Sequence, residues 1–176
     1  MTRALHIAVL ALVAVLFGCG GGAPGRSRDR QAELTALRQD LFTHTFKGAS
    51  ATALEKTIAI ARESKGALAA DAWSQAGLAR LDWALLGLLG GPNGLLERLI
   101  RHLGMPASCI AEGEIATDCL ALAVEGVAGP FRRASALYQE LGDPSQADLA
   151  MRRARLAETA LLHRVTESPV YFDAIR

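Results

Sequence analysis

The sequence predicts an all-α protein, and its composition is the first reason. Alanine and leucine account for 33 and 27 of the 176 residues, while residues 19–176 contain only four valines and six isoleucines. Alanine and leucine lose little side-chain freedom in a helix, and the β-branched residues that favour strands are scarce. The second reason is that apolar residues recur three and four positions apart, which is the spacing of one helix face. The third is that clusters of helix-breaking residues divide the chain into segments. Together they favour antiparallel helical hairpins, arranged as a short solenoid or as a bundle.

The N-terminus is typical of a cleaved export signal over residues 1–18. Arg3 gives a positive start, and an uncharged apolar run covers residues 7–17. At about 1.5 Å per residue this run is too short to cross a hydrocarbon core of about 30 Å. It fits the apolar region of a signal peptide better than it fits a membrane span.

The four residues Leu16-Phe17-Gly18-Cys19 resemble the lipobox of bacterial lipoproteins. The resemblance implies that Cys19 carries diacylglycerol, that the signal is cut before it, and that the new N-terminus is acylated as well, for example with palmitate. Two buried acyl chains already suffice for stable membrane anchoring. In enterobacterial lipoproteins an aspartate after the cysteine favours the inner membrane. Gly20 therefore favours the outer membrane and a protein facing the periplasm, with the inner membrane as the alternative.

The mature chain is expected to comprise a lipidated flexible tether over residues 19–29, a helical domain over residues 30–167 and an extended C-terminal tail over residues 168–176. The domain is long enough for one core of its own. We expect about seven helices in it, over residues 30–46, 52–65, 67–89, 95–103, 118–127, 131–141 and 143–165, with an irregular segment at 104–116.

The first two helices are indicated by an apolar face and a cap. Leucines at positions 34, 37 and 41 share one face of the first helix, which should end near Gly48. The second should begin at Thr52, because Thr52 and Glu55 have the spacing of a capping box. Its buried face would then carry Leu54, Ile58 and Ala61.

The third helix is apolar nearly all round between Trp83 and Leu89. Asp71, Arg80 and Asp82 interrupt it, so we expect a buried central helix rather than a membrane span. A Gly-Gly-Pro-Asn-Gly cluster at residues 90–94 separates it from the short fourth helix.

The last three helices are divided by turn signals. Gly129-Pro130 should end the fifth helix, and Asp143, followed by Pro144 and by Gln146 at the reciprocal cap position, should open the seventh.

Residues 131–154 resemble a tetratricopeptide repeat, an antiparallel helix pair of about 34 residues. One face of its first helix carries Phe131, Ala134, Ser135 and Tyr138, the turn is Leu-Gly-Asp, and the second helix carries Ala147, Met151 and Ala154. Trp73, Ala76 and Gly77 repeat the large-small-small spacing more weakly. The resemblance implies a tetratricopeptide-like short solenoid, and a plain helical bundle is the alternative.

Cys109 and Cys119 are the only thiols left once Cys19 is acylated. A pair of cysteines in an exported protein most often forms a disulfide. A metal site that uses both thiolates with His102 or His44 is the alternative, but the cysteines and histidines lack metal-ligand spacing. We expect the disulfide, no metal and no cofactor.

No catalytic motif stands out in the chain, so we do not expect an enzyme. The mature chain is formally neutral, which argues against nucleic acid as a partner. An anchor, a tether and a repeat-like body favour a membrane-anchored periplasmic interaction or assembly module that binds an envelope protein through a helical-repeat surface. Arg132, Arg133 and Gln139 are the candidate partner-binding residues. The alternative is a lipoprotein that binds a small apolar ligand for transport, lined by residues 83–89.

Overall fold

The structure is a computed structural model that describes residues 24–42, 50–88 and 94–163. The chain divides into two compact units, residues 1–33 and residues 34–176. The described part of the first unit is the beginning of helix α2 (Pro24–Phe42), and the other described elements belong to the second unit. The signal segment, Cys19 and the predicted tail at 168–176 lie outside the described residues.

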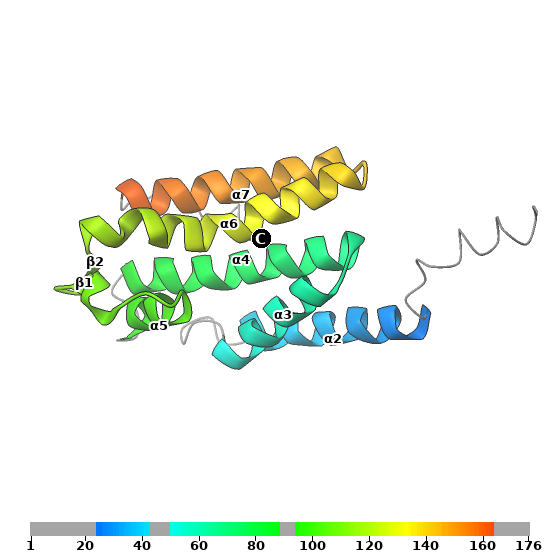
Figure 1. The fold of residues 1–176 in the computed structure, drawn as a ribbon, viewed down its shortest axis with the longest axis horizontal. Helices are drawn as coiled ribbons and strands as arrows, with labels where there is room; N and C mark the ends of the chain where they lie inside the picture. The colour runs from blue at the N-terminus through cyan, green and yellow to red at the C-terminus, as the bar shows by residue number, and fades with distance from the viewer. Residues whose placement is uncertain (1–23, 43–49, 89–93, 164–176) are drawn as a thin grey trace, which may run out of the picture. The chain divides into compact units, whose positions relative to one another are not determined.

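Six α-helices make up most of the described chain, which confirms the all-α prediction (Figure 1). Between the fourth and fifth of them lie two single-turn 3-10 helices and a two-stranded antiparallel hairpin. The elements after α2 are α3 (Ala51–Glu63), α4 (Gly66–Leu88), α5 (Leu95–His102), η1 (Ala107–Cys109), β1 (Ile110–Ala111), β2 (Glu114–Ile115), η2 (Thr117–Cys119), α6 (Leu120–Glu140) and α7 (Pro144–His163).

Helix α2 begins at Pro24 rather than near residue 30, so residues 24–29 of the segment predicted as a tether are helical. Proline suits the first position of a helix, where no backbone N–H is needed. The arginines and the Gln-Ala-Glu sequence that follow are good helix formers. The remainder of the predicted tether, residues 19–23, lies outside the described part.

Helix α3 starts one residue earlier than predicted, and its N-cap is Ser50 rather than Thr52. The Ser50 hydroxyl accepts a hydrogen bond from the backbone N–H of Ala53, with N···O 3.3 Å. Serine and threonine both cap helices, and the earlier cap also allows Ala53 to pack in the core. The predicted buried face of this helix, Leu54, Ile58 and Ala61, is confirmed.

Helix α4 is the central helix of the second unit. It packs against α3, α5, α6 and α7, and Figure 1 shows it running alongside α6. The side chains of Trp83 and Leu85 are almost fully buried, as expected for a helix that is apolar on most of its surface. A Cβ atom on Gly77 would lie 2.8 Å from the ring of Phe131. Glycine at this position therefore permits the close approach of α4 and α6.

Helix α6 is continuous through Gly129-Pro130, where the sequence predicts a break between two helices. Pro130 has no N–H to bond the carbonyl oxygen of Gly126 one turn earlier. The Arg80 guanidinium on α4 donates to that oxygen instead, with Nη1···O 2.7 Å. Gly129 has no Cβ to collide with the proline ring, so it can stay helical. A tertiary hydrogen bond therefore replaces the missing backbone bond, and two predicted helices become one.

Helices α6 and α7 form an antiparallel hairpin, as predicted for residues 131–154 (Figure 1). Its turn is closed by Gly142, with φ +72°, and by a hydrogen bond of 2.9 Å from the Asp143 N–H to the carbonyl oxygen of Tyr138. This is the Schellman pattern that ends many helices at a glycine. The Asp143 carboxylate then accepts from the backbone N–H of Gln146, 3.1 Å away, and caps α7.

The predicted packing face of this hairpin is buried. The Ser135 hydroxyl on α6 donates to the carbonyl oxygen of Ala147 on α7, 2.8 Å away, and draws the two backbones together. Met151 is half-buried, and the other predicted positions are buried: Phe131, Ala134, Ser135, Tyr138, Ala147 and Ala154. Membership of the tetratricopeptide family stays a prediction.

Among the described residues, no helix combines the length and hydropathy that a transmembrane span needs.

Candidate functional site

Cys109 and Cys119 are joined by a disulfide at the base of a small hairpin, as predicted. Their Cα atoms lie 5.5 Å apart, and both side chains are buried. Strands β1 and β2 between them turn at Glu112 and Gly113, which have φ of 54° and 81°. Two positive φ values are typical of a type I′ hairpin turn. The segment at residues 104–116, which was expected to be irregular, therefore contains a regular hairpin. The sequence did not indicate this hairpin clearly, because Glu-Gly is a weaker turn signal than Asn-Gly.

The described residues contain no group of three or more His, Cys, Asp or Glu side chains placed to hold a metal ion. Both thiols are used in the disulfide, and His44 lies outside the described part. The His102 ring packs edge-on against Trp83, with centroids 5.5 Å apart. Burial, together with the positive charge of Arg80, lowers the pKa of His102, and Glu55 partly opposes this effect.

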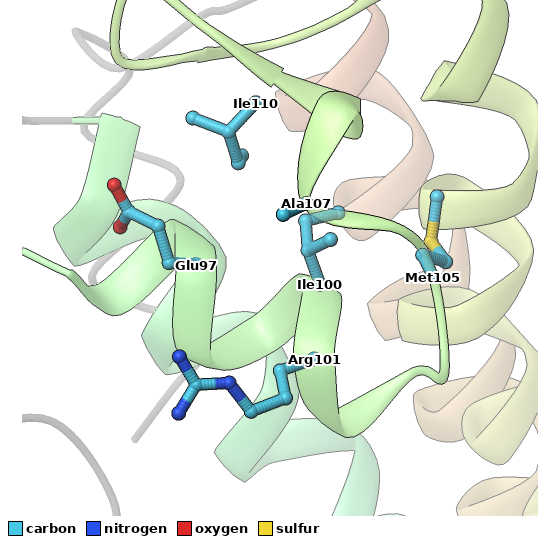
Figure 2. Close-up of a pocket in the computed structure, with 6 residues that line it drawn as sticks. All are labelled: Glu97, Ile100, Arg101, Met105, Ala107 and Ile110. Atoms are coloured by element: carbon cyan, nitrogen blue, oxygen red, sulfur yellow. The ribbon is translucent and has the colours of Figure 1, made fainter.

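A pocket of about 170 Å³ lies between α5 and the chain that follows it (Figure 2). Helix α5 supplies Glu97, Ile100 and Arg101, and Met105 and Ala107 lie on the other side with Ile110. The volume is below the roughly 300–1,000 Å³ of pockets for drug-sized ligands. This pocket therefore suits at most a small group.

The apolar segment expected to line a ligand pocket packs mainly in the core. Trp83, Ala84 and Leu85 are at most 1% exposed, and Leu86 and Leu88 are partly buried against the same core. Leu89 lies outside the described residues. None of these side chains lines the pocket beside α5.

Arg132 contacts two carboxylates of its own chain. Its guanidinium is ion-paired with Glu125 one and a half to two turns earlier on α6 and with Glu158 on α7, the latter at 2.6 Å. These contacts raise the pKa of Arg132, chiefly through the hydrogen bond to Glu158. Arg132 therefore ties the hairpin together, and its charge is largely compensated.

Arg133 lies in a different environment. Its guanidinium carbon lies 4.8 Å from the centroid of the Trp73 ring on α4, a cation–π contact. Gln139 is exposed near the end of α6. Its backbone carbonyl oxygen accepts a hydrogen bond from the backbone N–H of Gly142 in the turn. The three predicted partner-binding residues therefore do not form one cluster: Arg133 faces α4, Arg132 bridges to α7, and Gln139 lies at the hairpin turn.

Arg133 also affects Arg80 on α4, a residue that sequence reasoning did not assign to a site. Arg62 in the last turn of α3 and Arg133 both act on Arg80 electrostatically. Burial is the largest cause that lowers the pKa of Arg80 to about 10, followed by repulsion from Arg62 and then from Arg133. In the sequence, Arg80 stands out as a lone cation in an apolar helix.

Two further polar contacts join side chains of different helices. The Tyr138 hydroxyl donates to the carboxylate of Asp71 on α4. Burial and then Asp71 raise the pKa of this tyrosine above its ordinary value. On α7, Arg153 donates to the Ser74 hydroxyl at 3.3 Å. Helices α4, α6 and α7 are thus joined by side-chain hydrogen bonds.

No protein-family model, curated protein or solved structure matches this chain.

Proposed function

We propose that this protein is a membrane-anchored, non-enzymatic interaction module of the bacterial cell envelope, whose helical domain docks a protein partner. The Leu16-Phe17-Gly18-Cys19 sequence carries the proposal, because a lipobox directly after a short apolar run specifies a lipid anchor. Acyl chains on Cys19 would hold the helical domain at a membrane surface, facing the periplasm. The outer membrane is the proposed location.

The disulfide and the helical architecture support this function. Disulfides persist in oxidising compartments such as the periplasm, and the Cys109–Cys119 pair is buried within the fold. Stacked helical hairpins commonly present extended surfaces that recognise peptides or protein segments.

The anchor is tested with the full-length protein expressed in bacteria and labelled with radioactive palmitate. We expect the wild type to incorporate label and to fractionate with the outer membrane, and Cys19→Ser to incorporate none. Gly21→Ser is the matched control, because it changes a neighbouring residue and keeps the thiol. Label on Cys19→Ser equal to that on the wild type would refute lipidation at this residue.

Docking is tested by crosslinking in intact cells that carry the wild type, Cys19→Ser or Gly21→Ser. We expect one envelope protein to be crosslinked by the wild type and by Gly21→Ser, and far less of it by the unanchored Cys19→Ser. Equal recovery with all three proteins would show that the anchor does not position the domain for docking. Absence of any specific crosslink would contradict the docking function.

A further inference from the structure

The pocket between α5 and the chain that follows it combines an apolar interior with two opposite charges. Of its lining residues, Ile100 is buried, and Met105 and Ile110 are half-buried. Glu97 and Arg101 are exposed. Figure 2 shows both charged side chains on the same side of the view, with Ile100 between them and Met105. A ligand in this pocket therefore meets apolar groups inside and one charge of each sign at the edge.

The wall opposite α5 is fixed by a backbone hydrogen bond and by the disulfide. The chain turns back at the end of α5 through a bond of 3.0 Å from the Met105 N–H to the carbonyl oxygen of Ile100. Two other lining residues, Ala107 and Ile110, lie on either side of Cys109, which the disulfide holds. The pocket is therefore shaped before a ligand arrives, so less conformational entropy is lost on binding.

The volume of the pocket matches one aromatic ring. An engineered protein cavity of about 150 Å³ that is lined by apolar side chains binds benzene. The pocket beside α5 has a volume of about 170 Å³. The thioether of Met105 in its wall can adapt to the shape of a ligand, and sulfur makes favourable contacts with aromatic rings. The apolar part of the pocket therefore suits a side chain that carries one ring.

The charges of Glu97 and Arg101 are available to a ligand. The two residues lie four positions apart on α5, about 6 Å along the helix axis. In the part of the chain that the structure describes, neither forms an ion pair, unlike Arg132 and Arg152. A carboxylate binds an ammonium group, and a guanidinium fork matches the planar geometry of a carboxylate. The edge of the pocket therefore suits a small ligand that carries both an ammonium and a carboxylate group.

We infer that this pocket is a binding site for a free amino acid with an aromatic side chain, of which phenylalanine is the simplest. The ring lies against Ile100, Met105 and Ile110. The α-ammonium group contacts the Glu97 carboxylate, and the α-carboxylate accepts hydrogen bonds from the Arg101 guanidinium. The three groups of such a ligand diverge from one carbon atom, which fits an apolar pocket with both charges at its edge. This inference goes beyond the docking function and does not depend on it.

Binding is tested at Met105 itself. The full-length protein, with ¹³C-labelled methionine methyl groups, is titrated with phenylalanine in detergent and followed by NMR. Met105 lines the pocket, whereas Met151 lies on α7 and serves as the internal control. The Met105→Leu variant assigns the Met105 signal. We expect this signal to shift saturably, with a Kd in the millimolar range, while the Met151 signal stays in place. A Met105 signal that does not respond to phenylalanine would overturn the inference.

Truncated ligands test each of the three contacts in the same titration. 3-Phenylpropionate lacks the ammonium group, and phenethylamine lacks the carboxylate. Each should bind about threefold more weakly than phenylalanine, because ion pairs of exposed side chains contribute little but measurably. Glycine, which lacks the ring, should leave the Met105 signal unchanged. Binding of either singly charged ligand as tight as that of phenylalanine would show that the pocket does not recognise an amino acid.

Two variants of α5 test the assigned residues. Glu97→Gln should weaken phenylalanine binding about threefold without weakening that of 3-phenylpropionate, which has no ammonium group. Arg101→Gln should likewise weaken phenylalanine binding without weakening that of phenethylamine. Glu140→Gln and Arg155→Gln are the matched controls, because they remove exposed charges on α6 and α7 and should bind phenylalanine as the wild type does.

Circular dichroism of each variant checks that the fold persists. Equal phenylalanine affinity of the wild type and of both α5 variants would overturn the assignment of the two charged residues. Because the titration needs no protein partner, its outcome is independent of the crosslinking experiment. A positive titration without a specific crosslink would leave the amino-acid site standing and contradict docking, and the converse result would leave docking standing and remove the site.

Discussion

The hydrogen bond from Arg80 to Gly126 should be the contact that allows α6 to pass through Pro130, and a double-mutant cycle can measure this. The changes are Arg80→Met, Pro130→Ala and both together. Methionine keeps an apolar stem of similar length in the half-buried position of Arg80 but donates no hydrogen bond. Alanine at position 130 restores the backbone N–H, which can then bond the Gly126 carbonyl within the helix.

The expected magnitude follows from what each change leaves at the Gly126 carbonyl. With proline in place, Arg80→Met removes a charge-assisted bond of 2.7 Å and leaves that oxygen without its partner. Such losses cost about 1.5–3 kcal/mol. In the Pro130→Ala background the helix itself satisfies the oxygen, so Arg80→Met should cost about 1–2 kcal/mol less. Effects of either change on core packing or on the unfolded chain cancel in the cycle when they are independent.

Urea unfolding of the oxidised protein, followed by circular dichroism, gives the four free energies. Arg152→Met, combined with Pro130→Ala, is the control cycle, because Arg152 is exposed on α7 and paired with Asp148. Its coupling to position 130 should be close to zero. A coupling below about 0.5 kcal/mol between Arg80 and Pro130, which is within the usual limits of additivity, would refute the reasoning.

Two further predictions concern the disulfide and His102. Reduction of the Cys109–Cys119 bond should lower the free energy of unfolding by about 2–3 kcal/mol, because the short loop between the cysteines is released in the unfolded chain. Thermal unfolding with and without reductant checks this, and coincident curves would contradict it. Because the pKa of His102 is lowered in the fold, the unfolded chain binds a proton first as the pH falls through about 6.5. Stability should therefore decrease from about pH 7.5 to 5.5, and this pH dependence should be weaker in His102→Gln; parallel profiles would contradict it.

The helical elements could be predicted where the signals are local. Composition and apolar spacing predicted the all-α class, and breaker residues placed the ends of α4 and α5 within one residue of those observed. The cap at Asp143 was also predicted, because the residues that make it are neighbours in sequence. The two helices expected around Pro130 were not separate, since the group that compensates the proline is Arg80 on another helix. A local breaker signal cannot report that the Gly126 carbonyl finds its partner 46 residues away in the sequence.

The candidate site was less predictable, because charge compensation is decided by tertiary structure. Arg132 and Arg133 are adjacent and look equivalent in sequence. In the fold, Arg132 reaches Glu158 on α7, 26 residues away, whereas Arg133 reaches Trp73 on α4. Nothing in the sequence marked Arg62 as a candidate site residue. A basic residue is common in the last turn of a helix, because its charge interacts favourably with the helix dipole.

The contact between α6 and α7 is lined on the α7 side by alanines. Ala147, Ala150, Ala154 and Ala157 are each at most 3% exposed. A scan that truncates side chains to alanine cannot detect such positions, because they already have the truncated form. Damage at this surface comes from added volume, which forces two closely spaced backbones apart. These four α7 positions would therefore be silent in an alanine scan and sensitive in a scan of larger side chains.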